Sequence, residues 1–314
     1  MGDAASVLMS GGLVAFPTET VYGLGADASN AAAVARIYSV KGRPADHPLI
    51  VHVASMDGLG DWARDVTSYA ISLARDFWPG PMTLVVPRSE LAGDFVTGGQ
   101  DTVGVRVPNH SVALGLLEAF VRAGGKGVAA PSANRFGNVS PTSAQAVATE
   151  LGDYLADGDQ ILDGGSCDVG VESTIIDCTG DTPKILRPGA ITVEMIEQST
   201  GLKVVASVEE PVIRVSGSLD SHYAPAATVV LDQSPIAGQG FIAMADVVAA
   251  EGVVRLGVPR THEEFAQVLY AALRAADEQG LTTVVVQQPQ GDGIAIAIRD
   301  RLKRAAHAEL MGDE

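Results

Sequence analysis

The chain has 314 residues, a length at which two domains are a reasonable expectation. Hydrophobic residues make up 46% of it and aromatic residues only 5%, so its cores must depend mainly on aliphatic side chains. The formal net charge of −17 argues against a nucleic-acid-binding protein, because such binding needs a basic surface that displaces counterions from phosphates.

The sequence also limits where the protein works. It contains no apolar run near the roughly 20 residues that a membrane helix needs. The first residues lack the basic and apolar regions of a secretory signal. Cys167 and Cys178 are the only cysteines, too few for a disulfide framework or a cysteine-rich metal site. We therefore expect a soluble cytoplasmic protein that neither enters a membrane nor carries a metal site of its own.

The first 200 residues alternate short apolar runs with helical patterns, which predicts an α/β architecture. The spacing is irregular, which favours a mixed sheet over a strict βαβ series. The predicted strands are Leu13–Phe16, Leu49–Val53, Met82–Val86, Val103–Val107, Gly127–Ala130 and Thr174–Asp177. The predicted helices are Ala31–Val40, Val66–Phe77, Ser111–Arg122, Ser143–Leu151 and Val193–Thr200, with Thr142 and Gln145 as the capping box of the fourth.

Polar residues follow the first predicted strand, in the segment Pro17–Gly25 (PTETVYGLG). Open α/β sheets place ligands just past strand ends, so this segment is a candidate for a binding site. Its glycines, Gly23 and Gly25, mimic a dinucleotide fingerprint, but no acidic residue ends a second strand about 20 residues later. A tight turn before the first helix explains the two glycines equally well.

Cations stand inside motifs bounded by glycine and proline, which suggests an anionic ligand. Lys41 and Arg43 flank Gly42 before Pro44, and a point charge beside a bidentate guanidinium suits polyphosphate. Arg187 likewise lies beside a proline and a glycine, in the sequence Arg-Pro-Gly. Arg106 lies in an apolar strand, where it would be paired either with a buried carboxylate or with a ligand.

Hydroxyl-rich loops give weaker signals. Pro131–Asn134 and Ser140–Thr142 lead into a capped helix, a natural phosphate site, although turn and capping chemistry explains them as well. Ser173 could face a substrate. His47 and His52 have no third ligand beside them, so they do not predict a metal site. Neither a Walker A sequence nor a nucleophile elbow is present.

Residues 207–226 read as a linker, and a second α/β pattern follows. Its predicted strands are Thr228–Leu231, Gly240–Met244, Val253–Leu256 and Thr283–Val286. A helix is predicted over Thr261–Gln279, with Thr261 and Glu264 as capping box and Gly280 as its stop. A last helix, Ile294–Leu310, carries basic residues that we interpret as a solvated face: Arg299, Arg301, Lys303 and Arg304.

Taken in order, these motifs resemble the YrdC-like threonylcarbamoyl-AMP synthases over residues 10–200: PTETVYGLG, KGRPxDxPLIVH, WPGPMTLV, VGVRVP, PSAN with SPT, ESTI and RPG. The HYAP segment (222–225) and the C-terminal pattern resemble the long members of this family. The resemblance implies a twisted, open mixed sheet with flanking helices over 1–206, a linker or lid over 207–226, and a smaller Rossmann-like domain over 227–314.

The resemblance also implies an activity: L-threonine, bicarbonate and ATP, with magnesium, give threonylcarbamoyl-adenylate and pyrophosphate. A separate transferase then uses this product to modify adenosine 37 of tRNA. The implied threonine contacts are Thr20, His52, Arg106, the Ala130 backbone and Ser173. The implied ATP contacts are Arg43, His47, Thr102, Ser132, Ser140, Arg187 and Tyr223. Lys41 would face the phosphates, and it and Arg43 are the predicted catalytic residues.

The chain departs from the family pattern in two places. His47 stands where the family commonly has Asn, which would add a pH dependence near neutrality. The segment before HYAP contains Asp220 and hydroxyls instead of basic residues. An RNA-binding module of the same fold is the alternative function, which the net charge disfavours. A carbamoyl-adenylate step in hydrogenase maturation is a third reading, but its accompanying acylphosphatase and zinc-finger segments are not found in this sequence.

Overall fold

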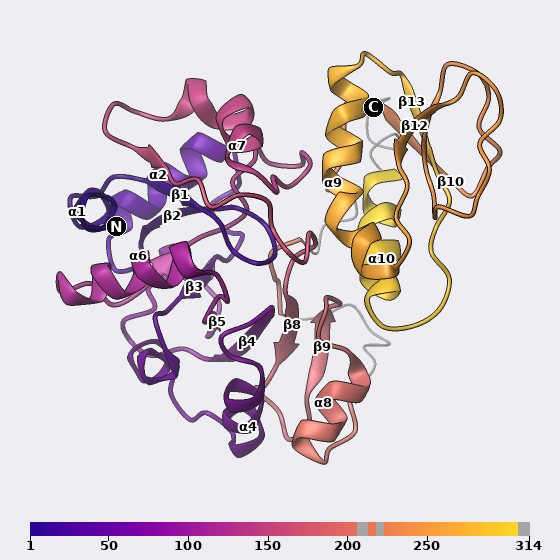
Figure 1. Ribbon diagram of the computed structural model, residues 1–314. Helices are drawn as coiled ribbons and strands as arrows, with labels where there is room; N and C mark the ends of the chain where they lie inside the picture. Colours follow the sequence, from indigo (N-terminus) through magenta and orange to yellow (C-terminus); the bar gives the residue numbers. More distant parts are fainter. Residues whose placement is uncertain (206–212, 218–222, 307–314) are drawn as a thin grey trace.

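The computed structural model describes residues 1–205, 213–217 and 223–306. It has two β-sheets, each with its own helices (Figure 1). The predicted linker is therefore described only at 213–217 and 223–226, and Asp220 and His222 lie outside the described residues. Among the described residues, no helix is both long and apolar enough to cross a membrane.

The large sheet has nine strands in the order β7-β1-β2-β6-β3-β5-β4-β8-β9. It is mixed, as predicted: β3 runs parallel to β5 and β4 to β8, whereas β4 and β5 are antiparallel. The strands are β1 Val14–Phe16, β2 Gly23–Asp27, β3 Ile50–His52, β4 Met82–Pro87, β5 Thr102–Arg106, β6 Val128–Ala129, β7 Gln160–Ile161, β8 Thr174–Asp177 and β9 Lys184–Arg187.

Helices cover both faces of this sheet. Side chains alternate between the faces along each strand, so Val14 and Phe16 pack with α1 and α6, while Ala15 packs on the opposite side with residues of α2. The helices are α1 Gly2–Met9, α2 Ala31–Lys41, α3 Leu59–Trp62, α4 Ser68–Phe77, α5 Asp94–Thr97, α6 Ser111–Arg122, α7 Ala144–Leu151 and α8 Val193–Thr200, with 3₁₀ turns at Met56–Gly58 and Gly152–Tyr154.

Every strand and helix predicted in this part of the chain is present, but two local predictions are wrong. Gly23 and Gly25 lie in strand β2, not in a turn. Position 25 needs a glycine because an added Cβ would lie 2.8 Å from Phe16 and 2.7 Å from Val128. Helix α7 is capped by Ser143, whose hydroxyl accepts from the Ala146 amide, and not by Thr142. Strands β2, β7 and β9 and helices α1, α3 and α5 were not predicted.

The small sheet follows the Rossmann pattern of parallel strands, in the order β10-β13-β11-β12. Its elements are β10 Thr228–Leu231, β11 Gly240–Ile242, β12 Val254–Gly257, α9 His262–Glu278, β13 Thr283–Val286 and α10 Ile294–Ala306. Thr261 caps α9 by accepting from the Glu264 amide at 3.2 Å, as predicted, and Gly280 follows the helix end with a φ of +66°.

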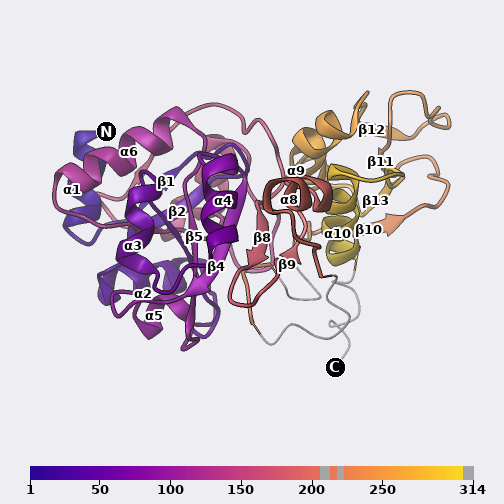
Figure 2. The same ribbon diagram turned by 90° about the horizontal axis from the view of Figure 1, so that it is seen from below.

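Helices α9 and α10 lie between the small sheet and the large one (Figures 1 and 2). One hydrophobic cluster crosses this boundary: Val21, Val139 and Val171 of the first part pack with residues of α9 such as Phe265 and Leu269. The solvated face predicted for α10 is wrong at Arg301, whose side chain is 0% exposed, whereas Lys303 is exposed. The difference matters because Arg301 points toward the large sheet.

Candidate active site

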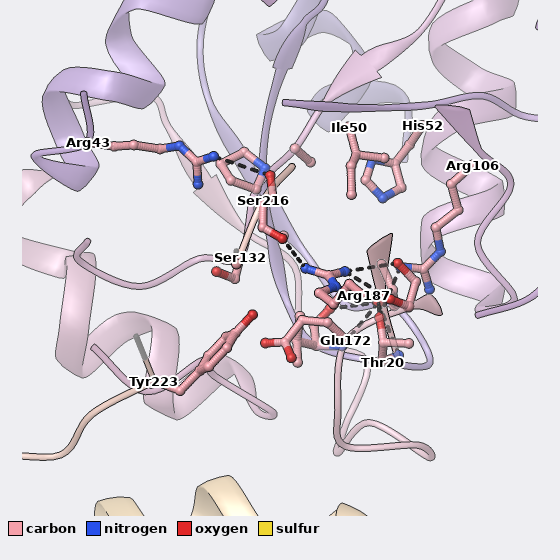
Figure 3. A pocket seen from close by; sticks show the side chains of 17 residues that line it. Thr20, Arg43, Ile50, His52, Arg106, Ser132, Glu172, Arg187, Ser216 and Tyr223 are labelled. Carbon is pink, nitrogen blue, oxygen red and sulfur yellow. Dashed lines mark hydrogen bonds between the residues drawn. The ribbon is translucent and has the colours of Figure 1, made fainter. Parts of the chain in front are cut away.

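One cavity collects the ends of several strands of the large sheet. The space between its walls, part of it open to solvent, is about 520 Å³. Its walls come from the segment after β1, from β3, β5 and β6, and from the residues around β8 and β9. Figure 3 shows their side chains converging on it from opposite sides. Most of the predicted site lines this cavity: Thr20, Arg43, His52, Arg106, Ala130, Ser132, Ser173, Arg187 and Tyr223.

Arg106 forms one end of the cavity. Its guanidinium donates to the Thr20 hydroxyl at 3.1 Å and to the Gly80 carbonyl at 3.3 Å. It also lies 2.7 Å from the carboxylate of Glu19, and both side chains are 5% exposed. The sequence left two partners open for Arg106, a buried carboxylate or a ligand. The structure shows the carboxylate, that of Glu19, and the Arg106 side chain also lines the cavity.

His52 lies beside Arg106, because β3 and β5 pair in a register that places these two residues opposite each other. Its ring meets Phe16 edge-on, with ring centroids 6.0 Å apart. Burial, together with the neighbouring Arg106 charge, lowers the pKa of His52 to about 3. This histidine therefore presents a neutral imidazole to the cavity at physiological pH.

Arg43 and Arg187 form a second, cationic region. Both bind Ser216: Arg43 donates to its hydroxyl at 3.2 Å and Arg187 to its carbonyl at 2.7 Å (Figure 3). Arg187 also donates to the carbonyl and hydroxyl of Ser173, at 3.0 and 3.2 Å. Burial lowers the pKa of Arg43 to about 10, so its charge persists at neutral pH.

Lys41 does not face the cavity, contrary to the prediction. It ends helix α2, is 2% exposed, and donates to the backbone carbonyls of Ser132, at 2.6 Å, and of Asn134. Burial and the nearby Arg43 lower the pKa of its ammonium well below the usual value. Lys41 therefore holds the loop that carries Ser132 through two backbone carbonyls.

Three further predicted residues lie off the main cavity. Thr102 lines a neighbouring space of about 300 Å³ that shares Ile50 and Ser216 with it. Ser140 is buried and donates to the Glu172 carboxylate at 2.6 Å. His47 is half-buried and meets Phe136 edge-on, and burial and Arg43 lower its pKa, so its protonation falls on the acidic side of neutrality.

The sequence reasoning missed the role of Glu172. This buried carboxylate lines the cavity and accepts hydrogen bonds from Ser140, Tyr270 and Arg301. Burial alone would raise its pKa, but the charges of Arg301 and then Arg187 hold the pKa at about 2. The sequence contains a signal that Arg301 is buried: it follows the apolar residues Ala295 and Ile298 at the same three-residue spacing along α10.

Family models match both parts of the chain. One for the Sua5, YciO and YrdC proteins, described as "Telomere recombination", matches residues 6–189. A second, described as "Threonylcarbamoyl-AMP synthase, C-terminal domain", matches residues 191–307. The chain belongs to the threonylcarbamoyl-AMP synthase family.

Two relatives in this family match over almost their whole length. The threonylcarbamoyl-AMP synthase of Pyrococcus abyssi is 42% identical, over 98% of this chain and 94% of that protein. The threonylcarbamoyl-AMP synthase of Bacillus subtilis is 39% identical, over 99% of this chain and 94% of that protein. The crystal structure of P. abyssi Sua5 complexed with L-threonine superposes with a TM-score of 0.86 at 39% identity, covering 97% of this chain and 93% of that one. The fold expected from the resemblance, a mixed sheet with a smaller Rossmann-like unit, is confirmed.

Proposed function

We propose that this protein synthesises threonylcarbamoyl-AMP, releasing pyrophosphate, from L-threonine, bicarbonate and ATP. One observation carries the proposal: a single cavity is lined by three guanidiniums, those of Arg106, Arg43 and Arg187. In a chain with a net charge of −17, three buried guanidiniums around one cavity, one of them paired with Glu19, favour an anionic ligand.

The Arg106 end suits the amino acid. A guanidinium can hold a carboxylate through two parallel hydrogen bonds, and the Thr20 hydroxyl lies beside it. Ser173 and the Ala130 backbone complete the wall of this end. L-threonine is the ligand of the P. abyssi relative, which supports the same substrate here.

The Arg43 and Arg187 end suits the nucleotide. Its fixed cations and the Ser132 hydroxyl would offset the charge of a triphosphate, and Tyr223 lines the cavity near them. Ser216 accepts from Arg43 through its hydroxyl and from Arg187 through its carbonyl. Phosphate oxygens that bind these two guanidiniums would replace Ser216, which belongs to the described piece of the linker, 213–217. A lid formed by the whole linker falls largely outside the described residues.

The chemistry then rests on placement and electrostatics. The threonine amine attacks the carbon of bicarbonate and forms a carbamate with loss of water. If bicarbonate first loses hydroxide to give carbon dioxide, the amine adds to the carbon dioxide and releases a proton. A carbamate oxygen attacks the α-phosphorus of ATP, and the bond to pyrophosphate breaks. Arg43 and Arg187 would stabilise the charge on the departing pyrophosphate, and Lys41 would act by fixing the Ser132 loop.

Magnesium would enter with ATP. Among the described residues, no group of three or more His, Cys, Asp or Glu side chains is placed to hold a metal ion. Glu172, whose carboxylate is the one found on the cavity wall within the described ranges, is already held by Ser140, Tyr270 and Arg301. Magnesium commonly binds through substrate phosphates and water, which fits this donor set, and it would neutralise phosphate charge.

The product is a reactive mixed anhydride that must pass to an acceptor, so a separate threonylcarbamoyl transferase acting on tRNA adenosine 37 is the partner we propose. We place the reaction in the cytoplasm, where these substrates are available. The comparisons favour the synthase over an RNA-binding module, because the relatives found over the full chain are synthases.

The test is direct. Purified protein with L-threonine, bicarbonate, ATP and magnesium should release pyrophosphate, and the rate should fall to background when threonine is omitted. A control with L-alanine in place of L-threonine reports on the side-chain pocket. Pyrophosphate release that is independent of threonine, or absent, would remove the proposal.

A further inference from the structure

Helix α10 of the C-terminal part places one cation, Arg301, behind the Glu172 carboxylate that lines the cavity. The Arg301 side chain is fully buried, and its Nε donates to the Glu172 carboxylate at 2.7 Å. Its Nη2 donates to the Glu172 carbonyl at 3.4 Å. Glu172 precedes Ser173, which is bound by Arg187 through both its carbonyl and its hydroxyl. The arginine is thus one residue away from the predicted substrate contacts.

The same guanidinium also supports Tyr223. Its carbon lies 5.5 Å from the centroid of the Tyr223 ring, and that ring stacks on Tyr270 with centroids 5.8 Å apart. Tyr270 in turn donates to Glu172 at 2.8 Å. Arg301, Tyr270 and Tyr223 therefore form one packed group beside a carboxylate that lines the cavity. Figure 3 shows Glu172 and Tyr223 of this group at the cavity wall.

The position of Glu172 poses an electrostatic problem. Its carboxylate stands in the cavity wall where we expect a triphosphate, and two negative charges in a water-poor site repel each other strongly. Arg301 removes this repulsion by pairing with Glu172 from the side away from the cavity. Burial would otherwise favour the protonated carboxyl.

We propose that Arg301 is a positioning residue of the active site: it neutralises Glu172 and fixes Ser173 and Tyr223, so that the C-terminal part completes the ATP site. The inference rests on the proposed function, and it assigns to this part of the chain a role that its relatives' names do not describe. It predicts that losing Arg301 harms ATP binding chiefly because Glu172 is left unpaired.

The experiment compares R301M, E172Q and the double variant E172Q/R301M in the full-length protein. Lys303→Met is the matched control, because it removes one positive charge from the exposed face of the same helix. R301M should raise the KM for ATP about tenfold or more, with a smaller change in the KM for threonine. The double variant should recover most of that loss, and K303M should match the wild type.

The pH profile separates this role from a purely structural one. Without Arg301 the pKa of Glu172 rises because burial favours the protonated carboxyl, although Arg187 and the Ser140 hydroxyl still favour the charged form. The defect of R301M should therefore shrink as the pH is lowered and Glu172 takes up a proton. Binding of a non-hydrolysable ATP analogue, measured by calorimetry, should follow the same order of variants. A double variant no better than R301M, or an R301M defect independent of pH, overturns the inference.

Two further outcomes remain decisive. If R301M does not fold, E172Q/R301M carries the test, since neither charge is then buried: ATP-analogue binding near that of the wild type supports the inference, and its loss in a folded protein overturns it. If wild-type protein binds the analogue but releases no threonine-dependent pyrophosphate, the proposed function fails, while the binding comparison still decides the role of Arg301.

Discussion

Arg106 and Glu19 form a buried ion pair of 2.7 Å at the end of the cavity that we assign to threonine. Removing one member of such a pair leaves an uncompensated charge in the interior, which costs about 3–5 kcal/mol. The pair therefore links substrate binding to stability, and substitutions on its two sides should separate the two effects.

Arg106→Gln should raise the KM for threonine at least tenfold, because a charge-assisted hydrogen bond to a carboxylate contributes about 1.5–3 kcal/mol. It should also lower the free energy of unfolding, since Glu19 loses its partner. The double variant E19Q/R106Q should recover stability in urea denaturation but not threonine affinity. Recovery of both would mean that Arg106 acts only on Glu19.

Lys41→Met should reduce both activity and stability. The buried carbonyls of Ser132 and Asn134 would lose their donor, at a cost of about 1–3 kcal/mol each. Steady-state kinetics should show a raised KM for ATP as the Ser132 loop shifts, together with a lower melting temperature. Lys126→Met, which removes a surface lysine paired with Asp61, is the control and should change neither. A K41M enzyme that loses turnover at unchanged stability would favour direct contact with phosphate.

Gly189→Ala should abolish activity. An added Cβ would lie 2.8 Å from the carbonyl oxygen of Glu172, and backbone there cannot move without displacing Ser173. Gly180→Ala is a matched control, because nothing lies within 4 Å of the Cβ that it adds. Thermal melting and pyrophosphate release should therefore separate the two variants clearly. Similar behaviour of both would show that the segment tolerates a shift.

His52 should make the fold less stable in acid. Its pKa is about 3 in the folded protein against 6.5 in an unfolded chain, so below pH 6.5 only the unfolded state takes up the proton. Stability should fall by about 1.4 kcal/mol for each pH unit between 6.5 and 3 on account of this residue. His52→Gln should flatten the curve of urea-unfolding free energy in this window. A slope equal to that of the wild type would mean that His52 is protonated in the folded state.

The large elements were predictable because their signals are local. Thr261 capping α9 and the apolar run around Val51 in β3 depend on residues only a few positions apart. Strand β7 has only two residues, Gln160 and Ile161, which is too short to show an alternating pattern of apolar residues. Three of the four residues of β9 are only partly buried, so its sequence shows no clear apolar pattern either. Residue 25 is a glycine because Phe16 and Val128 leave no room for a side chain in strand β2. Phe16 and Val128 are distant from Gly25 in the sequence, so no local pattern predicts this contact.

The sequence by itself determined the family, the α/β class and most of the residues that meet in the cavity, because each motif keeps its residue types at a fixed spacing. Only the tertiary structure decided what each cation touches. Lys41 donates to the Ser132 carbonyl, Arg106 forms an ion pair with Glu19, and Arg301 of α10 forms an ion pair with Glu172. A buried charge must find its partner wherever the fold brings one within reach, and residues 172 and 301 become neighbours only when the two sheets and their helices pack together.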